Sequence, residues 1–333
     1  MNAAIFVPAF LALTFQQGTT PPRIEAANPA NQAAGAVPGN LVPDNQALSG
    51  SANSAAAGGP VSDILAACWS TNSVVRFDGQ TGNFEGTFTI GGPLRLPSGL
   101  DFGPDGNLYV TSFYWDTVLE YDGATGQYIG TFIPAGLGGL NQPALLKFRP
   151  DGLLYVLASY DGGVFRYDAR TGAFHDVFIP SGAGGITTAF AMTFGPDGDI
   201  YLGGYYSKEV VRFDGQTGAV EGVVAPYVDT PSGMAFGPDG TLYVGEWRTG
   251  SFFHHNIQRY TPQGDSLGVL TELAQGPLDL MFDAAGLLYV GGASSIDVLD
   301  GATGDWIDSM SHPGVENLMA ITFIPRTRAR FPR

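Results

Sequence analysis

The stretch Phe102-Gly-Pro-Asp-Gly-Asn-Leu-Tyr-Val110 decides the fold, because the chain repeats it almost unchanged. Further copies begin at Phe148, Phe194, Phe236 and Phe282, and a partial copy occupies Phe323-Ile-Pro325. Neighbouring copies start 41 to 46 residues apart. A period of this length indicates a repeat protein whose units have to be interpreted together.

Each unit contains the signals for four short strands. Pro104-Asp105-Gly106 predicts a tight turn between two strands, because Pro presets φ, Asp supplies an acceptor and Gly tolerates a positive φ. Leu108-Tyr-Val110 resumes as the second strand and Val118-Leu-Glu-Tyr121 forms a third. Asp122-Gly-Ala-Thr-Gly126 then turns the chain into a fourth strand at Tyr128-Ile-Gly-Thr-Phe132. Four antiparallel strands in a unit of this length are typical of a propeller blade.

The first and last units are incomplete in complementary ways. Residues 64–89 supply strands two to four without an innermost strand, and Leu318–Phe323 is an innermost strand with no successor. We therefore predict an all-β, six-bladed β-propeller with four antiparallel strands per blade, in which the C-terminal strand completes the first blade. Such closure removes the exposed edges of an open array.

The sequence divides into three parts: an N-terminal arm over residues 1–62, the propeller over 63–325, and a basic tail over 326–333. The arm begins with an apolar run and continues as a low-complexity Ala, Asn, Gly and Pro tract. A helix over the run would span roughly 20 Å, too short for a ~30 Å hydrocarbon core, so we expect no transmembrane span. The tail concentrates four arginines in eight residues.

Three interpretations of the arm stay open. It has the apolar core of an export signal, but no Lys or Arg precedes it and no small-x-small cleavage site follows closely. It can alternatively act as a strand donated to a neighbouring subunit, since short uncharged apolar runs pair with exposed sheet edges. The third interpretation is an unstructured tail. The residues expected to carry assembly are Ile5, Phe6, Val7, Phe10, Leu11, Leu13 and Phe15.

The composition excludes several classes of function. A net charge of −16 with only two lysines, Lys147 and Lys208, argues against binding to nucleic acid and to anionic membrane surfaces. Part of this acidity belongs to the repeated turns, so it does not indicate a store of cations. The single cysteine, Cys68, excludes an intramolecular disulfide, and its place in a predicted strand indicates a buried thiol.

The tandem units, with the stretch at Phe102 followed by Val118-Leu-Glu-Tyr-Asp-Gly-Ala-Thr-Gly126, resemble the NHL-repeat and virginiamycin B lyase-like six-bladed propellers. They are similar in particular to bacterial extracellular proteins with such units. The resemblance covers roughly residues 63–325 and implies the propeller fold and an extracellular or cell-surface location. The family includes ligand-binding scaffolds, partner-binding modules, a lyase and metal-dependent lactonases, so an activity has to be argued from the site.

A lactonase of this kind would hold a metal with oxygen ligands from its inner strands. The positions before each motif Phe are Asp101, Lys147, Thr193, Ala235, Met281 and Thr322. This mixture lacks an oxygen cage for a hard cation. Asp279, Glu316 and Asn317 lie close to the starts of innermost strands and offer two or three oxygens as an alternative. We expect no bound metal and no cofactor.

A lyase would need a His and a Glu as acid and base. His175 is expected in an outer strand, where its side chain is solvated. His254 and His255 lie in an extended hairpin, Arg248 to Gln258, where an insertion interrupts the repeat. Such an insertion is a candidate contact for a partner or ligand, and a longer polar loop is the alternative. The sequence contains no nucleophile elbow, phosphate loop or zinc-spaced cluster.

The segment after each second strand is the most variable part of the unit. Its aromatic and neighbouring polar residues form a candidate ligand or partner surface: Trp69, Tyr114, Trp115, Tyr160, Tyr205, Tyr206, Trp247 and Arg248. Aromatic residues gathered in this way can bind a glycan or a protein. They can equally fill the packing between blades, or support stacking of subunits.

We therefore predict a non-enzymatic, extracellular or cell-surface structural or adhesive subunit. It would form a homo-oligomer or filament through residues 1–62. One alternative is a secreted propeller enzyme, either a lyase or a metal-dependent lactone hydrolase. Another is a monomeric module that binds a glycan or protein.

Overall fold

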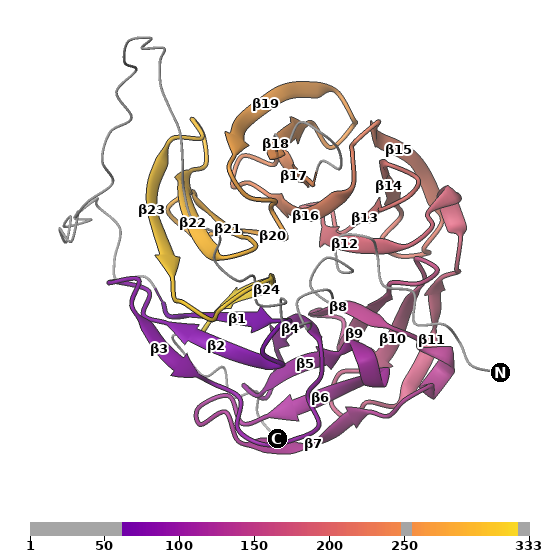
Figure 1. Ribbon diagram of the computed structural model, residues 1–333. Helices are drawn as coiled ribbons and strands as arrows, with labels where there is room; N and C mark the ends of the chain where they lie inside the picture. The colour runs from indigo at the N-terminus through magenta and orange to yellow at the C-terminus, as the bar shows by residue number, and fades with distance from the viewer. Residues whose placement is uncertain (1–61, 248–254, 326–333) are drawn as a thin grey trace, which may run out of the picture. The chain divides into compact units, whose positions relative to one another are not determined.

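The computed structural model describes residues 62–247 and 255–325, which form a six-bladed β-propeller (Figure 1). Each blade is a four-stranded antiparallel sheet. The fold predicted from the repeat is therefore confirmed. The predicted arm residues and the basic tail lie outside the described residues, except for Ser62. The described residues contain no helix long and apolar enough to span a bilayer.

From the centre outwards, the first three blades contain the following strands. Blade 1 has β24 (Leu318–Phe323), β1 (Ile64–Cys68), β2 (Ser73–Phe77) and β3 (Phe84–Thr87). Blade 2 has β4 (Pro97–Phe102), β5 (Leu108–Ser112), β6 (Thr117–Tyr121) and β7 (Tyr128–Ile133). Blade 3 has β8 (Pro143–Phe148), β9 (Leu153–Ala158), β10 (Val164–Asp168) and β11 (Phe174–Ile179).

The other three blades follow the same order. Blade 4 has β12 (Ala189–Phe194), β13 (Ile200–Gly204), β14 (Glu209–Phe213) and β15 (Val220–Pro226). Blade 5 has β16 (Pro231–Phe236), β17 (Leu242–Glu246), β18 (His255–Tyr260) and β19 (Ser266–Leu273). Blade 6 has β20 (Asp279–Phe282), β21 (Leu287–Gly291), β22 (Ser295–Asp300) and β23 (Trp306–Ser311). Short 3₁₀ turns lie at η1 (Phe113–Trp115), η2 (Leu137–Gly139) and η3 (Ala183–Gly185).

The two ends of the propeller meet in blade 1. Strand β24 pairs antiparallel with β1, so that Phe323 lies opposite Ile64. The N–H of Ile324 donates to the carbonyl of Asp63 at 2.8 Å. The same bond closes the Pro-Asp-Gly turn of blade 2, where Gly103 donates to Asn107 at 2.9 Å. In blade 1 the first two strands are therefore not joined by a Pro-Asp-Gly turn. They come from the two ends of the propeller, and the hydrogen bond that closes this turn in blade 2 is retained between them.

The geometry of the second repeated turn explains why Asp and Gly recur in it. In blade 2, Asp122 Oδ1 accepts hydrogen bonds from the N–H of Ala124 and from the N–H and hydroxyl of Thr125. Gly126 has a φ of 71°, and a Cβ there would lie 1.8 Å from the carbonyl oxygen of Phe88 in blade 1. Glycine is required for both reasons, because other residues rarely adopt this φ and have no room for their Cβ.

The repeats define two faces of the propeller. We call the end that carries the Pro-Asp-Gly turns the turn face. We call the opposite end, where each second strand finishes and each innermost strand begins, the mouth face. Strand β24 runs from the mouth face, where Trp69 N–H donates to the carbonyl of Asn317, to the turn face at Ile324.

Candidate functional site

The mouth face is built from the residue that follows the second strand of each blade. These equivalent residues are Trp69, Phe113, Ser159, Tyr205, Trp247 and Gly292. In blades 1 to 5 the N–H of this residue, as in Tyr205 to Thr188 at 2.7 Å, donates to the carbonyl of the residue just before an innermost strand, whereas Gly292 N–H donates to Ser295. Five of those preceding residues have a left-handed φ between 49° and 55°: Leu96, Gln142, Thr188, Thr230 and Asn317. This repeated turn holds the ends of the blades in a fixed arrangement.

Aromatic rings from blades 1, 2 and 4 pack together at this face and form what we call the aromatic plug: Trp69, Phe113, Phe190 and Tyr205. Trp69 and Phe113 are 5.1 Å apart, Phe113 and Phe190 6.4 Å, and Phe190 and Tyr205 6.0 Å, measured between ring centroids. All four are buried. Phe113 belongs to blade 2 and Phe190 to blade 4, so these rings meet across the mouth between blades that are not neighbours. Two of the predicted surface residues, Trp69 and Tyr205, therefore pack inside the propeller.

Other predicted surface residues remain exposed. Trp115, Tyr160 and Tyr206 have 48%, 53% and 49% of their surfaces exposed. Tyr114 is half-buried, and the guanidinium of Arg95 lies 4.7 Å from its ring centroid. The structure thus separates the predicted aromatic set into a buried plug and an exposed group around it.

Blade 5 places two buried ionisable groups at the same face. Glu246, at the end of β17, is 2% exposed, and its Oε1 accepts the N–H of Asp229 at 3.0 Å. His255 begins β18 and packs against Trp247 with ring centroids 5.0 Å apart. Burial lowers the pKa of His255, which favours the neutral imidazole. The predicted residues Arg248 and His254 lie outside the described residues.

The channel carboxylates cap main-chain groups. Asp101 Oδ2 accepts the N–H of Phe148 in the next blade at 3.0 Å. Asp279 Oδ2 accepts the N–H of Ile321 at 2.9 Å across the seam between blades 6 and 1. Desolvation raises the pKa of Asp279 to about 6, although the Ile321 N–H and the charge of Lys147 oppose this rise. Both carboxylates satisfy the edges of neighbouring innermost strands, which would otherwise lack partners.

The other residues considered as oxygen ligands lie at the mouth. The carbonyl of Glu316 accepts the Cys68 thiol at 3.1 Å, and Asn317 Nδ2 donates to Ser70 Oγ at 3.0 Å. Cys68 is buried, as its position in a strand predicts. His175 is exposed in β11, again as predicted.

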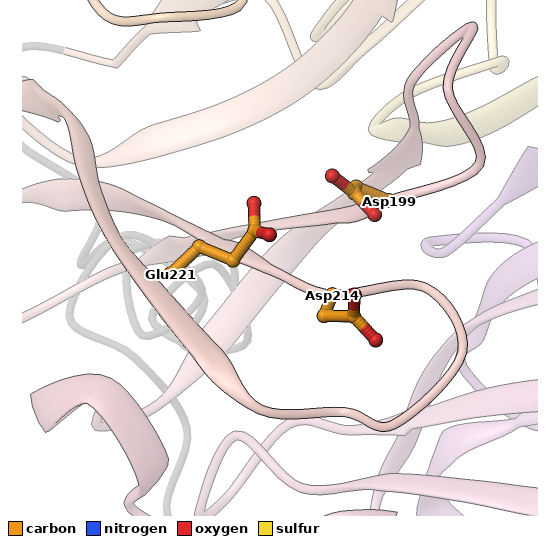
Figure 2. Close-up of side chains that lie close together, drawn as sticks. All are labelled: Asp199, Asp214 and Glu221. Carbon is orange, nitrogen blue, oxygen red and sulfur yellow. The ribbon is translucent and has the colours of Figure 1, made fainter.

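Within the described residues, one group of carboxylates lies close enough to hold a cation: Asp199, Asp214 and Glu221 (Figure 2). Arg212 occupies their neighbourhood, with Nε 2.8 Å from Asp199 Oδ2 and 2.6 Å from Glu221 Oε2. Asp214 Oδ1 accepts three hydrogen bonds from its own turn. The guanidinium already pairs with Asp199 and Glu221 at the place where a cation would bind.

The same arrangement recurs in blade 1. Arg76 pairs with Asp63 and lies 2.7 Å from Glu85 Oε2. Asp63 Oδ1 also accepts the N–H of Gly79, as Asp199 Oδ1 accepts that of Gly215. The carboxylate cluster is therefore a structural ion-pair network of the repeat.

Comparison with known proteins identifies no matching family model and no matching curated protein. Among solved structures, a chain of a nidogen/laminin complex has a TM-score of 0.65 at 15% identity, covering 80% of this chain and 98% of that one. A gluconolactonase from Xanthomonas campestris has a TM-score of 0.54 at 17% identity, covering 66% and 77%. A streptogramin B lyase has a TM-score of 0.50 at 18% identity, covering 66% and 70%.

These likenesses show the fold. At such identities they carry no assignment of activity, because one propeller architecture supports binding and catalysis alike.

Proposed function

We propose that this chain is a non-catalytic, protein-binding β-propeller with a structural or adhesive role outside the cell or at its surface. The observation that carries the proposal is the aromatic plug. A propeller enzyme needs reacting groups that a substrate can reach, and the buried rings of Phe113 and Phe190 meet across the mouth between blades 2 and 4. The buried rings of the plug make this face rigid, and the exposed tyrosines around them can contact a partner.

The polar groups support the same proposal. Asp101 and Asp279 accept main-chain N–H groups, and Asp199 and Glu221 form ion pairs with Arg212. Each of these groups therefore has a structural role. A partner-binding propeller needs no further chemistry from them.

The proposal includes self-assembly through residues 1–62. The apolar run with Phe6, Phe10 and Phe15 carries no charge and can add as a strand to the sheet edge of another copy. A heterologous contact that does not close on itself produces a filament.

The test compares the full chain with one that lacks residues 1–62, using light scattering after size exclusion and electron microscopy. We expect assemblies from the full chain and monomers from the shortened one. Two monodisperse monomers would refute assembly through the arm.

One observation favours a second candidate, an enzyme of the lyase type. Glu246 and His255 are both buried at the mouth of blade 5, and a lyase needs an acid and a base in one site. Glu246→Gln and His255→Gln would separate the two functions. If either substitution abolishes turnover of a cyclic ester substrate while the protein stays folded, the non-catalytic proposal is wrong.

A further inference from the structure

A set of tyrosines on the mouth face follows the repeat. Tyr114, Tyr160 and Tyr206 occupy the same position in blades 2, 3 and 4, one residue after the position of the plug. Tyr227, in the connection from blade 4 to blade 5, is 92% exposed. We call these four residues the tyrosine arc. Their recurrence in consecutive blades produces a row of aromatic side chains along one side of the mouth.

Contacts with buried residues and ion pairs hold two residues of the arc, Tyr206 and Tyr227, in place. Tyr206 packs against the buried ring of Tyr205, with centroids 4.9 Å apart. Tyr227 has a φ of 63°, which is unfavourable for a non-glycine residue. Its loop is held by the ion pair of Lys208 with Asp229 at 2.8 Å, and by the bond from the Asp229 N–H to Glu246. An aromatic side chain held in solvent at the expense of backbone strain is typical of a contact residue for a partner.

One tyrosine of the arc already contacts an arginine of the same chain. The guanidinium of Arg95 lies over the ring of Tyr114 at 4.7 Å. Acidic side chains stand near the arc at Asp116, Asp161 and Glu209, in the loops and strand starts that follow the tyrosines. Tyrosine faces and carboxylates together attract arginine, through cation–π contacts and charge.

The chain itself contains an arginine-rich segment, Arg326-Thr-Arg-Ala-Arg-Phe-Pro-Arg333, in a sequence with a net charge of −16. This segment follows Pro325 on the turn face, because Ile324 is bonded to Asp63 at the position of a Pro-Asp-Gly turn. The arc lies on the mouth face. The described chain therefore ends at Pro325 on the face opposite the arc.

The segment is too short to reach the arc of its own chain. Eight extended residues span about 26 Å. The route around the outside crosses three strand spacings of ~4.8 Å and then runs the ~20 Å length of a blade, roughly 35 Å in all. The direct route through the channel ends at the aromatic plug.

We propose that the tyrosine arc binds the arginine-rich segment 326–333 of a second copy of this chain. The turn face of one propeller then lies against the mouth face of the next. This contact is heterologous and does not close on itself, so it produces a linear stack. It rests on the proposed self-assembly and adds a route to it that does not involve residues 1–62.

The decisive experiment titrates a synthetic peptide, Arg-Thr-Arg-Ala-Arg-Phe-Pro-Arg, into the full chain at low salt, with calorimetry as the readout. We expect saturable 1:1 binding that weakens as salt rises. The variant Tyr160→Ser/Tyr206→Ser should bind about tenfold more weakly, because two cation–π contacts are lost. Tyr160→Phe/Tyr206→Phe keeps the ring faces and should bind like the parent. Trp306→Ser, on the outer strand β23 and 64% exposed, is the matched surface control and should change nothing.

Two results overturn the proposal. The first is absence of peptide binding. The second is equal binding to the parent and to Tyr160→Ser/Tyr206→Ser, which would mean attraction to the acidic body as a whole.

A pairing experiment tests the direction of the contact. The serine variant keeps its arginine segment, and Arg328→Gln/Arg330→Gln keeps its arc. In fluorescence anisotropy, labelled serine variant should bind the glutamine variant more tightly than the glutamine variant binds itself, because association through residues 1–62 is common to both pairs. Self-association of the glutamine variant as strong as that of the parent would refute the arc contact and leave assembly through residues 1–62 intact, since removal of those residues measures that route separately.

Discussion

Tyr289 of blade 6 lies edge-on against Phe323 of the C-terminal strand, with ring centroids 5.1 Å apart and ring planes at 87°. Both residues come from the repeated stretch, but from different copies of it. The same contact joins Tyr109 to Phe148 and then three further pairs of adjacent blades: Tyr155–Phe194, Tyr201–Phe236 and Tyr243–Phe282. The Phe and Tyr of the repeat therefore make contacts between blades, and Tyr289 with Phe323 makes this contact at the seam between blades 6 and 1.

The first prediction concerns this closing seam. Tyr289→Leu should lower the free energy of unfolding by about 1–2 kcal/mol, because an edge-to-face aromatic contact and part of a buried ring are lost. The seam between blades 1 and 2 already has Leu65 at the Tyr position, so leucine fits the backbone. Urea denaturation measures the change. Tyr206→Leu, at an exposed position, should remain within about 0.5 kcal/mol of the parent, and a larger effect there would show that the assay reports something other than the seam.

The fold can be predicted from the sequence because its turns depend on local residues. The triplet Pro104-Asp105-Gly106 specifies a turn, and it specifies the same turn in each further copy. The aromatic plug does not follow, because it depends on contacts between blades that are far apart in the sequence. Phe190 occupies a position where blades 2 and 3 have Ser98 and Ala144, and no local pattern indicates that it meets Phe113.

The role of the channel carboxylates also depends on contacts between blades, which the local sequence does not indicate. Asp279 was a candidate metal ligand in the sequence because of its residue type and its place near an innermost strand. Its oxygens instead accept the N–H groups of Leu280 and Ile321. An unpaired strand edge in a neighbouring blade cannot be recognised from the residues beside Asp279.

The second prediction is a pH dependence of stability due to Asp279. Its pKa is about 6 in the folded protein against an ordinary value of 3.8, so the folded state binds this proton more tightly than the unfolded state. The stabilisation is complete below pH 3.8 and is lost as pH rises through about 6. Acidification from pH 7.5 to 5 should therefore raise the contribution of Asp279 to the free energy of unfolding by about 1 kcal/mol. Buried His255, whose pKa is lowered, contributes in the opposite direction, so the contribution of Asp279 is the difference between the parent and a variant without this carboxyl group.

Asp279→Asn is the matched variant, since its amide oxygen can still accept an N–H. It should remove this slope between pH 7.5 and 5, as measured by urea denaturation at several pH values. The turn aspartate Asp78 does not titrate in this pH range, because hydrogen bonds from Thr81 lower its pKa and its contribution to stability is lost only below about pH 4. An unchanged slope in the variant would assign the effect to another group.

The third prediction separates two consequences of replacing a glycine. Gly126 and Gly136 have nearly equal φ values, 71° and 72°, but only Gly126 has a neighbour in the way, with Phe88 O at 1.8 Å from a Cβ. Gly136→Ala should lower the free energy of unfolding by about 1 kcal/mol, the effect of the backbone alone. Gly126→Ala should lower it by at least about 3 kcal/mol, because blade 1 has to move. Thermal and urea unfolding of the two variants measure the difference, and equal losses would mean that the blades are not packed as closely as described.

The last prediction concerns Arg212, whose guanidinium lies among Asp199, Glu221 and the neighbouring Asp197. Arg212→Gln removes the positive charge that pairs with them and should lower the free energy of unfolding by about 2 kcal/mol. This is less than the ~3–5 kcal/mol of a fully buried pair, because Arg212 is partly exposed. Arg170→Gln, in an exposed turn, is the control and should have almost no effect.

Because the carboxylates of Asp199, Asp214 and Glu221 lie within 4.8 Å of one another, millimolar Ca²⁺ should restore part of the stability of Arg212→Gln and should leave the parent unchanged. Stabilisation of the parent by Ca²⁺ to the same extent would show that the carboxylates bind a cation beside Arg212, and the structural role assigned to the network would then be wrong.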